Sequence, residues 1–343
     1  MRMLKKYIKK YGLPLVIIGG LGKLTSIICV FGIYGHWFST LLPDESENIT
    51  VYLDPENTLE EYLITIEDVV TKSGGHGERL IRTLSWRGWN ERITPGKFEI
   101  KAGESIGDVA QKLATGDRES VRVIVPAGRD LDVIAGKIAL RIAADSSDVL
   151  KLISPDSIRW QIIPNTYEMW WETDAEGAIN RLIKESEIWW NADRLEKAKS
   201  KGISAEEAVI LASIVQAETA VLSEAPIVAG LYLNRLDIGQ LLQADPTLIY
   251  AWDDESITRV LDIHKEIDSP YNTYKNTGLP PGTIRVPEPT YIEAVLNATE
   301  HDYLYMCAEP GGTGKHSFAR KYREHLKNAR KYQKWLNKQH IYR

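Results

Sequence analysis

The sequence predicts an α+β protein in three parts: an N-terminal transmembrane helix, a small α/β domain and a larger, mixed but helix-rich domain. Three observations support this prediction. A basic segment precedes a long apolar run, a strand–turn–helix pattern recurs after it, and helical patterns then dominate to the C-terminus. With 343 residues, of which 43% are hydrophobic, the chain is large enough for two cores. We place the parts at residues 1–12 (cytoplasmic tail), 13–42 (anchor), 48–128 and 129–343.

Composition excludes several classes of function. The formal net charge of −5 gives no reason to expect nucleic acid as a partner. The two cysteines, Cys29 and Cys307, are too few for a disulfide framework, and Cys29 falls within the apolar run. No group of Cys and His has the spacing of metal ligands. We therefore expect neither a metal nor another cofactor.

The N-terminal apolar run extends from Leu13 to about Leu42 and is interrupted by Lys23. Because a membrane span needs about 20 apolar residues, two spans fit: Leu13–Tyr34, with Lys23 inside, or Leu24–Leu42. We favour the second, because Lys23 can then extend its ammonium group to the lipid headgroups. Trp37 would lie near the far interface, where tryptophan is favoured.

The charges that flank this run predict its orientation. Lysines precede it, and the acidic residues Asp44, Glu45 and Glu47 follow it. The positive-inside rule then keeps the N-terminus in the cytoplasm and places the body outside, on a single-pass membrane protein. The alternative is a cleaved signal peptide. No small-x-small cleavage site follows the run, and the run is long for a signal peptide.

The second part repeats one pattern three times: a short alternating strand, a tight turn, a capping residue and an amphipathic helix. The expected strands are Thr50–Asp54, Lys97–Lys101 and Val121–Val125. The expected helix N-caps are Thr58, Ser105 and Asp130. A further helix, Gly77–Arg87, lies between the first two copies. The unequal spacing excludes a solenoid and indicates a small α/β domain over residues 48–128.

Residues 129–203 read as mainly helical, with an irregular aromatic segment from Ile158 to Glu172. This segment contains Trp160, Tyr167, Trp170 and Trp171. Two interpretations stay open. Aromatic rings can stack on the apolar faces of sugars and line a glycan groove, or they can pack in the core, because tryptophan buries a large area.

One helix carries the strongest candidate for chemistry. Ser204 and Glu207 form a capping box that starts it, and good helix formers follow to Ala220. At 100° per residue, Leu211, Val215 and Glu218 fall on one face, so Glu218 points toward the interior. Burial disfavours a carboxylate and raises its pKa, which is what a general acid needs near neutral pH. The alternative is an acid that ends an apolar stripe in a salt bridge.

The chain beyond this helix is dense in polar and turn residues. These are the candidates for substrate binding: Gln243, Asp245, Tyr271, Asn272, Thr273 and Tyr274. A rigid loop, Gly278–Gly282, follows with the sequence Gly-Leu-Pro-Pro-Gly. Rigid loops beside a buried carboxyl suit substrate positioning. Alternatively, Asn272 and Thr273 only satisfy buried backbone groups.

These segments together resemble one known family. Leu211–Thr219 (LASIVQAET) is similar to the active-site helix of the endolytic murein transglycosylases, the YceG-like family. Further segments resemble the family in the same order: 228–236 (VAGLYLNRL), 242–247 (LQADPT), 271–274 (YNTY) and 278–282 (GLPPG). The resemblance covers nearly the whole chain. The first folded unit of the chain, residues 48–128, is similar to a LysM-like glycan-binding module.

The resemblance implies roles for particular residues. Glu218 takes the position of the catalytic glutamate. Gln216 stands where the family usually has a second acid, which supports Glu218 acting alone. The Gly-Gly-His-x-Phe loop of the family appears as Gly314-Lys315-His316-Ser317-Phe318, which places His316 at the groove and replaces one glycine with lysine.

The activity that the resemblance implies is that of a lyase. Such an enzyme cuts the MurNAc–GlcNAc bond within peptidoglycan strands and leaves 1,6-anhydroMurNAc ends. The expected setting is the bacterial cytoplasmic (inner) membrane with the catalytic body outside, where the enzyme terminates growing strands beside peptidoglycan synthases. Two alternatives stay open: a muramidase that hydrolyses the same bond, for which Asp245 is the only second carboxylate, and a non-catalytic peptidoglycan-binding scaffold.

Overall fold

The computed structural model describes residues 35–254, 256–257 and 260–339. Contacts divide the chain into two compact units, with the division between Ser120 and Val121. From the sequence we expected this division after residue 128. The strand that begins at Ser120 explains the difference, because it pairs with a later strand, Asn165–Trp170, of the second unit.

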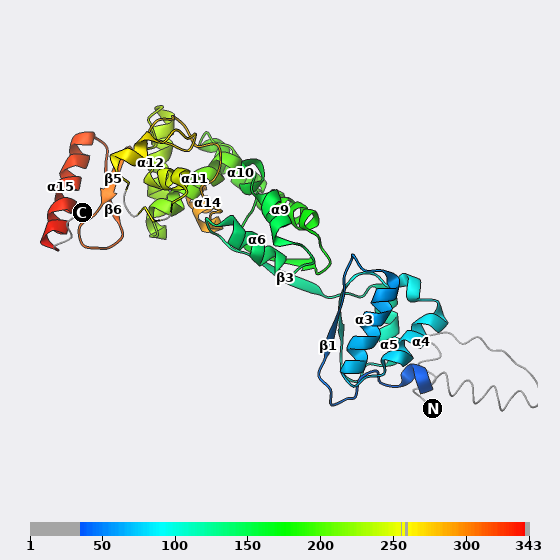
Figure 1. The fold of residues 1–343 in the computed structure, drawn as a ribbon. Coiled ribbons are helices and arrows are strands. Elements are labelled where there is room, and N and C mark those ends of the chain that lie inside the picture. The colour runs from blue at the N-terminus through cyan, green and yellow to red at the C-terminus, as the bar shows by residue number, and fades with distance from the viewer. Residues whose placement is uncertain (1–34, 255, 258–259, 340–343) are drawn as a thin grey trace, which may run out of the picture. The chain divides into compact units, whose positions relative to one another are not determined.

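The N-terminal unit is a two-stranded antiparallel sheet with its helices on one face (Figure 1). Its elements are β1 Ile49–Leu53, α3 Leu59–Lys72, α4 Gly77–Arg87, the 3-10 turn η1 Asn90–Arg92, β2 Gly96–Ile100 and α5 Ile106–Thr115. The predicted N-caps are confirmed: the side chains of Thr58 and Ser105 accept hydrogen bonds from the backbone N–H groups of Glu61 and Asp108. Alternation along the strands turns Val51 and Phe98 into the core.

The end of the predicted anchor belongs to this unit. Leu41 and Leu42 are fully buried in its core, and Trp37 is 8% exposed. The N–H of Leu41 donates to the carbonyl of Glu104 (2.8 Å), and Thr40 forms a β-bridge with Ser105. The placement of the span at Leu24–Leu42 is therefore wrong at its C-terminal end, because these apolar side chains fill a globular core.

The remainder of the predicted anchor, residues 13–34, lies outside the described residues. Within the described part of the chain, no helix combines the length and apolar character of a membrane span.

The described residues of the C-terminal unit are mostly helical and include the sheets β3–β4 and β5–β6. Its first half contains β3 Ser120–Val125, α6 Leu131–Ala139, α7 Ser146–Ile153, α8 Asp156–Arg159, β4 Asn165–Trp170, α9 Ala175–Trp189 and α10 Ala192–Ser200. Its second half contains α11 Ala205–Glu218, η2 Leu222–Glu224, α12 Ala225–Asp237, α13 Asp245–Trp252, η3 Asp262–Glu266, α14 Pro289–Leu296, β5 Tyr305–Ala308, β6 His316–Ala319 and α15 Tyr322–Lys338. The third strand–turn–helix copy does form, as β3 and α6 with Asp130 as N-cap, but β3 pairs with β4.

Helix α11 lies at the centre of the larger core. Ser204 and Glu207 form the predicted capping box at its start. Every residue from Ala208 to Val215 is buried, so the helix is enclosed on all sides. The expectation of a one-sided apolar stripe is thus corrected: α11 is a central helix. Its buried Ser213 accepts a hydrogen bond from the N–H of Ile284, which ties the loop after Pro-Pro-Gly to the helix.

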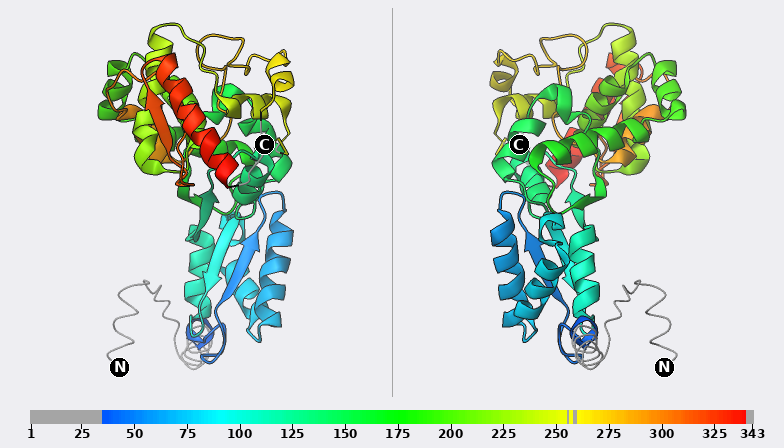
Figure 2. Two further views of the ribbon diagram at one scale, coloured as in Figure 1. Left: turned by 90° about the vertical axis from the view of Figure 1, so that its left-hand side faces the viewer. Right: turned by 90° about the vertical axis from the view of Figure 1, so that its right-hand side faces the viewer.

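The unit ends in an antiparallel hairpin, β5–β6, and in α15, which lies alongside it (Figure 2). The register pairs Tyr305 with Ala319 and Ala308 with His316. In the aromatic segment before α9, Tyr167 is buried in the core, as the packing interpretation predicted, whereas Trp170 is 47% exposed. A glycan groove along this segment stays a prediction.

Candidate functional site

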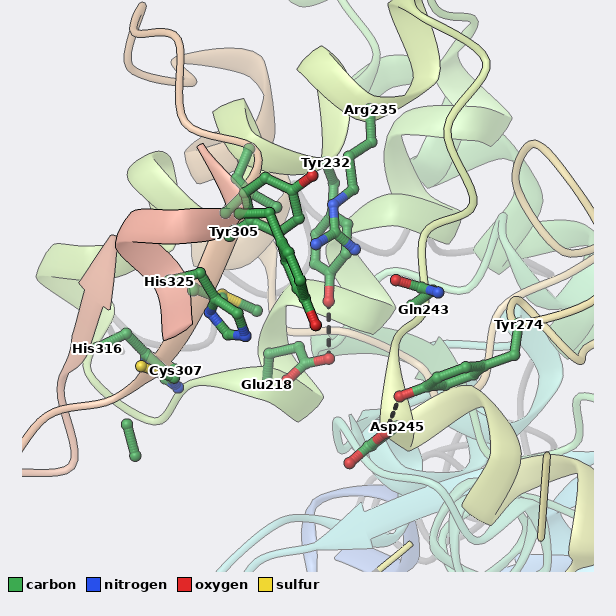
Figure 3. Close-up of a pocket in the computed structure, with 14 residues that line it drawn as sticks. Glu218, Tyr232, Arg235, Gln243, Asp245, Tyr274, Tyr305, Cys307, His316 and His325 are labelled. Atoms are coloured by element: carbon green, nitrogen blue, oxygen red, sulfur yellow. Dashed lines mark hydrogen bonds between the residues drawn. The ribbon is translucent and has the colours of Figure 1, made fainter. Parts of the chain in front are cut away.

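A cavity of about 400 Å³ opens at the C-terminal end of α11. Residues of α11, α12, α13, the loop before α14, the hairpin and α15 line it. Figure 3 shows Glu218 between two walls, with His316, Tyr305 and His325 on one side and Gln243 and Asp245 on the other. Of the predicted site residues, the fold brings Glu218, Gln243, Asp245, Tyr274 and His316 together here.

Glu218 is the last residue of α11, and the chain turns to an extended conformation at Thr219. The buried helix therefore delivers the carboxyl group to the cavity at its final turn. The hydroxyl of Tyr232 donates a hydrogen bond to Glu218 Oε1 (2.7 Å; Figure 3). Burial raises the pKa of Glu218 to about 7, and the negative charge of Asp245 acts in the same direction. The Tyr232 bond and the charge of Arg235 oppose this rise.

Tyr232 and Arg235 stand three residues apart on α12, so their side chains share one face of the helix. The Nε of Arg235 donates to the carbonyl of Leu304 (2.7 Å), and a second guanidinium nitrogen donates to the carbonyl of Leu242. Burial, and to a lesser extent the negative charge of Glu218, raises the pKa of Tyr232. Its hydroxyl therefore stays a neutral donor. The cavity thus has a fixed donor and a fixed cation beside its acid.

Asp245 is the first residue of α13, directly after the N-cap Ala244. Its carboxylate lines the cavity and accepts a hydrogen bond from the hydroxyl of Tyr274. Burial and this bond raise the pKa of Tyr274, which keeps it protonated. Gln243 precedes the helix in a left-handed conformation (φ 49°), an uncommon geometry for a residue other than glycine.

Tyr271, Asn272 and Thr273 are not among the residues that line this cavity. The hydroxyl of Tyr271 donates to Asp156 Oδ2 (2.8 Å). Asn272 is fully buried and donates to the carbonyls of Lys265 and Ile267 (both 2.8 Å).

Thr273 Oγ1 accepts from the N–H of Ala244 (3.0 Å) and lies 2.8 Å from the hydroxyl of Thr247. It is 2% exposed. Asn272 and Thr273 therefore do what the structural alternative predicted: they satisfy buried groups and hold the loop that presents Tyr274.

The hairpin wall is tied to the rest of the site by Glu224, which is 7% exposed. The backbone N–H of His316 donates to Glu224 Oε1 (3.0 Å), and His316 Nδ1 lies 3.1 Å from Oε2. In the adjoining loop the left-handed conformation falls on Gly314 (φ 73°) and not on Lys315. The lysine that replaces a glycine of the family motif therefore adds no backbone strain here.

Gln216 does not line the cavity. Its side-chain oxygen accepts a hydrogen bond from the N–H of Glu288 (2.8 Å), just before α14. Gln216 therefore holds the start of a neighbouring helix.

Sequence reasoning missed several residues of the site. Tyr232 and Arg235 had a signal, because they are polar residues three apart on a helix that is mostly apolar. Tyr305 and His325 had none. Their rings stack with centroids 5.7 Å apart, and this contact depends on how α15 packs on the hairpin. Burial, with Arg235 nearby, lowers the pKa of His325.

Comparisons with known proteins all find similarity to YceG-like proteins or to endolytic murein transglycosylases. A family model described as the YceG-like family matches residues 58–331. A protein from Bacillus subtilis (strain 168) described as an endolytic murein transglycosylase is 30% identical over 264 residues, which cover 69% of this chain and 72% of that protein. A relative with the same description from Streptococcus pneumoniae (strain ATCC BAA-255 / R6) is 31% identical over 175 residues, 49% of this chain but only 31% of that protein.

A crystal structure of a yceG-like protein from Listeria monocytogenes superposes with a TM-score of 0.51 at 24% identity. The match covers 82% of this chain and 99% of that one. At this level of identity the likeness concerns the fold alone.

The link between Glu224 and the hairpin generates a prediction. Glu224→Ala removes the acceptor of the His316 N–H and leaves a buried donor unsatisfied, at a cost of about 1–3 kcal/mol. We expect faster amide hydrogen exchange in residues 305–319, measured by mass spectrometry, and little change in α11. Glu309→Ala is the control, because Glu309 is half-buried in the same hairpin and its side chain accepts a hydrogen bond from the hydroxyl of Thr313, which lies within the hairpin loop. Equal exchange in both variants would contradict the assigned role of Glu224.

Proposed function

The chain belongs to the YceG-like family, and we propose that it cuts the glycan strands of peptidoglycan with Glu218 as its single catalytic acid and base. Its reaction class is that of an endolytic murein transglycosylase, a lyase that acts on polysaccharide. The observation that carries the assignment of Glu218 is its carboxyl group in the cavity, with a pKa raised to about 7 by burial. Near neutral pH such a group is protonated often enough to act as an acid.

The proposed reaction has two proton transfers through the same group. Protonated Glu218 donates to the glycosidic oxygen as the bond between that oxygen and C1 of N-acetylmuramic acid breaks. The resulting carboxylate then accepts the proton of the sugar's own C6 hydroxyl while O6 bonds to C1. The product is a 1,6-anhydro end, and no water is consumed. Because O6 is tethered close to C1, the attack gains the advantage of an intramolecular step.

The neighbours of Glu218 suit this sequence. Tyr232 donates to Oε1, so the proton of the neutral acid belongs on Oε2, the oxygen left to meet the substrate. The charge of Asp245 favours the protonated form of Glu218, and a carboxylate in the cavity also stabilises positive charge that develops at C1. Gln243, Tyr274 and His316 line the same space and are proposed to bind the sugars. Asn272 and Thr273 are proposed to position Tyr274.

One observation favours the muramidase alternative. Asp245 is a second carboxylate in the cavity, and glycoside hydrolases use such pairs to activate water or to form a covalent intermediate. The hydrogen bond from Tyr274 occupies one of its oxygens. The product distinguishes the two reactions. A non-catalytic scaffold has less support, because it would have no use for a buried acid with a raised pKa.

We further propose the cellular setting. The basic N-terminus, the apolar run and the acids after it support a single membrane span with the body outside the cytoplasm of a bacterial cell. Because residues 37–42 serve the globular core, Leu13–Tyr34 is the better choice of span. The N-terminal unit, with α5 beside a two-stranded sheet, is proposed to be a LysM-like glycan-binding module. Termination of growing strands beside peptidoglycan synthases follows from the same proposal.

The role of Glu218 predicts the effect of Glu218→Gln. The amide keeps the shape of the side chain but cannot donate and then accept the proton, so strand cleavage should fall about a hundredfold or more. Folding should be retained. The rate is measured with purified protein on peptidoglycan strands, and near-normal activity of the folded variant would move the chemistry to another residue.

The proposed chemistry predicts the product. Ends released from within long strands should be 1,6-anhydromuramic acid, which is one water lighter than a hydrolysed end and is not reduced by borohydride. Mass spectrometry of the digest, with and without borohydride, reads both properties. Reducible ends that carry the additional water would identify a muramidase with Asp245 as its second carboxylate.

The hydrogen bond from Tyr232 predicts a pH effect. Because the acid must be protonated, activity should fall as the pH rises through the pKa of Glu218, about 7. The Tyr232 bond stabilises the carboxylate, so Tyr232→Phe should raise that pKa and move the alkaline limb of kcat/KM upward by about one pH unit.

Tyr291→Phe is the matched control for this measurement. Tyr291 lies on α14 and is also buried. Its hydroxyl donates to the carbonyl of Thr219 (3.0 Å), the residue after α11, and not to the carboxyl of Glu218. Its alkaline limb should match the wild type. A shift of the same size in both variants, or in neither, would show that Tyr232 does not set the pKa.

A further inference from the structure

A second cavity of about 370 Å³ lies in the C-terminal unit, and three arginines, Arg129, Arg159 and Arg285, line it. They come from separate segments: the turn after β3, the end of α8 and the loop before α14. Nothing in the proposed chemistry of Glu218 uses them. Tyr250, Leu131 and Ile284 add aromatic and aliphatic surface to the same cavity.

The backbone forces two of these cations together. Gly128 and Val286 form an antiparallel β-bridge with hydrogen bonds in both directions (3.0 and 2.7 Å). Arg129 and Arg285 each adjoin this isolated bridge, and both line the cavity. Like charges brought close together repel each other. An anion between the two guanidinium groups would remove the repulsion.

The donors of the arginines are only partly used. Arg159 is 8% exposed and donates to Tyr250, to the carbonyl of Thr283 (3.1 Å) and to the carbonyl of Ser154. The Nε atoms of Arg159 and Arg285 are buried, and neither has a hydrogen-bond partner within the part of the chain that the structure describes. Buried donors are nearly always satisfied in native proteins, so these two atoms indicate a missing acceptor.

The acids of the cavity do not supply that acceptor. Asp130, Asp132 and Asp253 are all exposed. Asp130 accepts from two backbone N–H groups as the N-cap of α6. Asp253 lies 3.5 Å from Arg129, and its side chain is 99% exposed. Outside the lining of the cavity, Asp156 pairs with Arg159 through Nη1 (3.3 Å), which leaves the Nε of Arg159 without a partner among the described residues. The guanidinium groups therefore lie inward and the carboxylates lie at the rim.

We propose that this cavity binds a carboxylate of the stem peptide carried by the peptidoglycan strand. This inference rests on the proposed function. A planar guanidinium pairs with a carboxylate through two parallel hydrogen bonds, and the apolar wall suits the aliphatic part of a short peptide. Helix α13 connects the two sites: Asp245 at its start lines the first cavity, and Tyr250 lines the second. Along the helix axis, Asp245 and Tyr250 are five residues and therefore about 8 Å apart. Two or three extended peptide residues span such a distance.

The test compares three substrates with the full-length protein: strands with native stems, strands whose stem carboxylates are methyl-esterified, and strands from which an amidase has removed the stems. The wild type should cleave native strands about tenfold or more faster than the other two, the effect expected from one charge-assisted hydrogen-bond pair. In Arg285→Gln this ratio should fall to about one. Arg285→Lys, which keeps the charge but not the planar fork, should give an intermediate ratio.

Arg181→Gln is the matched control, because Arg181 is exposed on α9 and pairs with Glu185 on the surface. It should keep the wild-type ratio. A wild type that cleaves all three substrates equally, or an Arg285→Gln variant with an unchanged ratio, would overturn the subsite and leave the proposed function intact. A different result is that strands with esterified stems are cleaved as fast as native strands, while added inorganic phosphate removes the rate advantage of both over strands without stems. That result would assign the cavity to phosphate and overturn the carboxylate proposal. A wild type that cleaves none of the substrates would refute the proposed function itself.

Discussion

The structure of the C-terminal unit depends on one constraint: a carboxyl group must be held largely out of water and still face a cavity. Helix α11 meets this constraint by being buried from Ala208 to Val215 and ending at Glu218. An enclosed helix cannot tilt or slide without disturbing the core on every side, so its last residue has a fixed position. The turn to an extended conformation at Thr219 then frees the space that the substrate needs.

The groups around the acid hold its pKa in a useful range by opposing one another. Burial and Asp245 favour the neutral form, whereas Tyr232 and Arg235 favour the anion. Burial alone would hold the proton too tightly for Glu218 to release it, and strong ion pairing would leave no proton to donate. Each neighbour is itself fixed: Arg235 by backbone carbonyls, Tyr232 within the core and Asp245 by Tyr274. An ionised carboxyl in such a place lowers the free energy of unfolding. The position of Glu218 therefore suits proton transfer at a cost in stability.

Local patterns in the sequence predicted the elements well, because caps and alternation act over a few residues. Thr58, Ser105, Asp130 and Ser204 all cap the helices expected of them. Long-range pairing was beyond such patterns. Nothing local says that β3 pairs with β4, or that Leu41 and Leu42 fill a core and do not enter a membrane, since an apolar run is compatible with both. The site followed the same rule. The helix pattern together with the family resemblance identified Glu218, and polar composition identified Asp245, but the hairpin wall with Tyr305 and His325 depends on tertiary packing.

The proposed chemistry depends on Glu218, a carboxyl group whose pKa burial raises to about 7. The most direct measurement is a carbon-13 NMR titration of the glutamate carboxyl groups, with the Glu218 signal identified by its absence in Glu218→Gln. We expect the Glu218 carboxyl to titrate near pH 7, far from the ordinary range of glutamate side chains. Titration of Glu218 with an ordinary pKa, close to 4.5, would contradict the proposed chemistry.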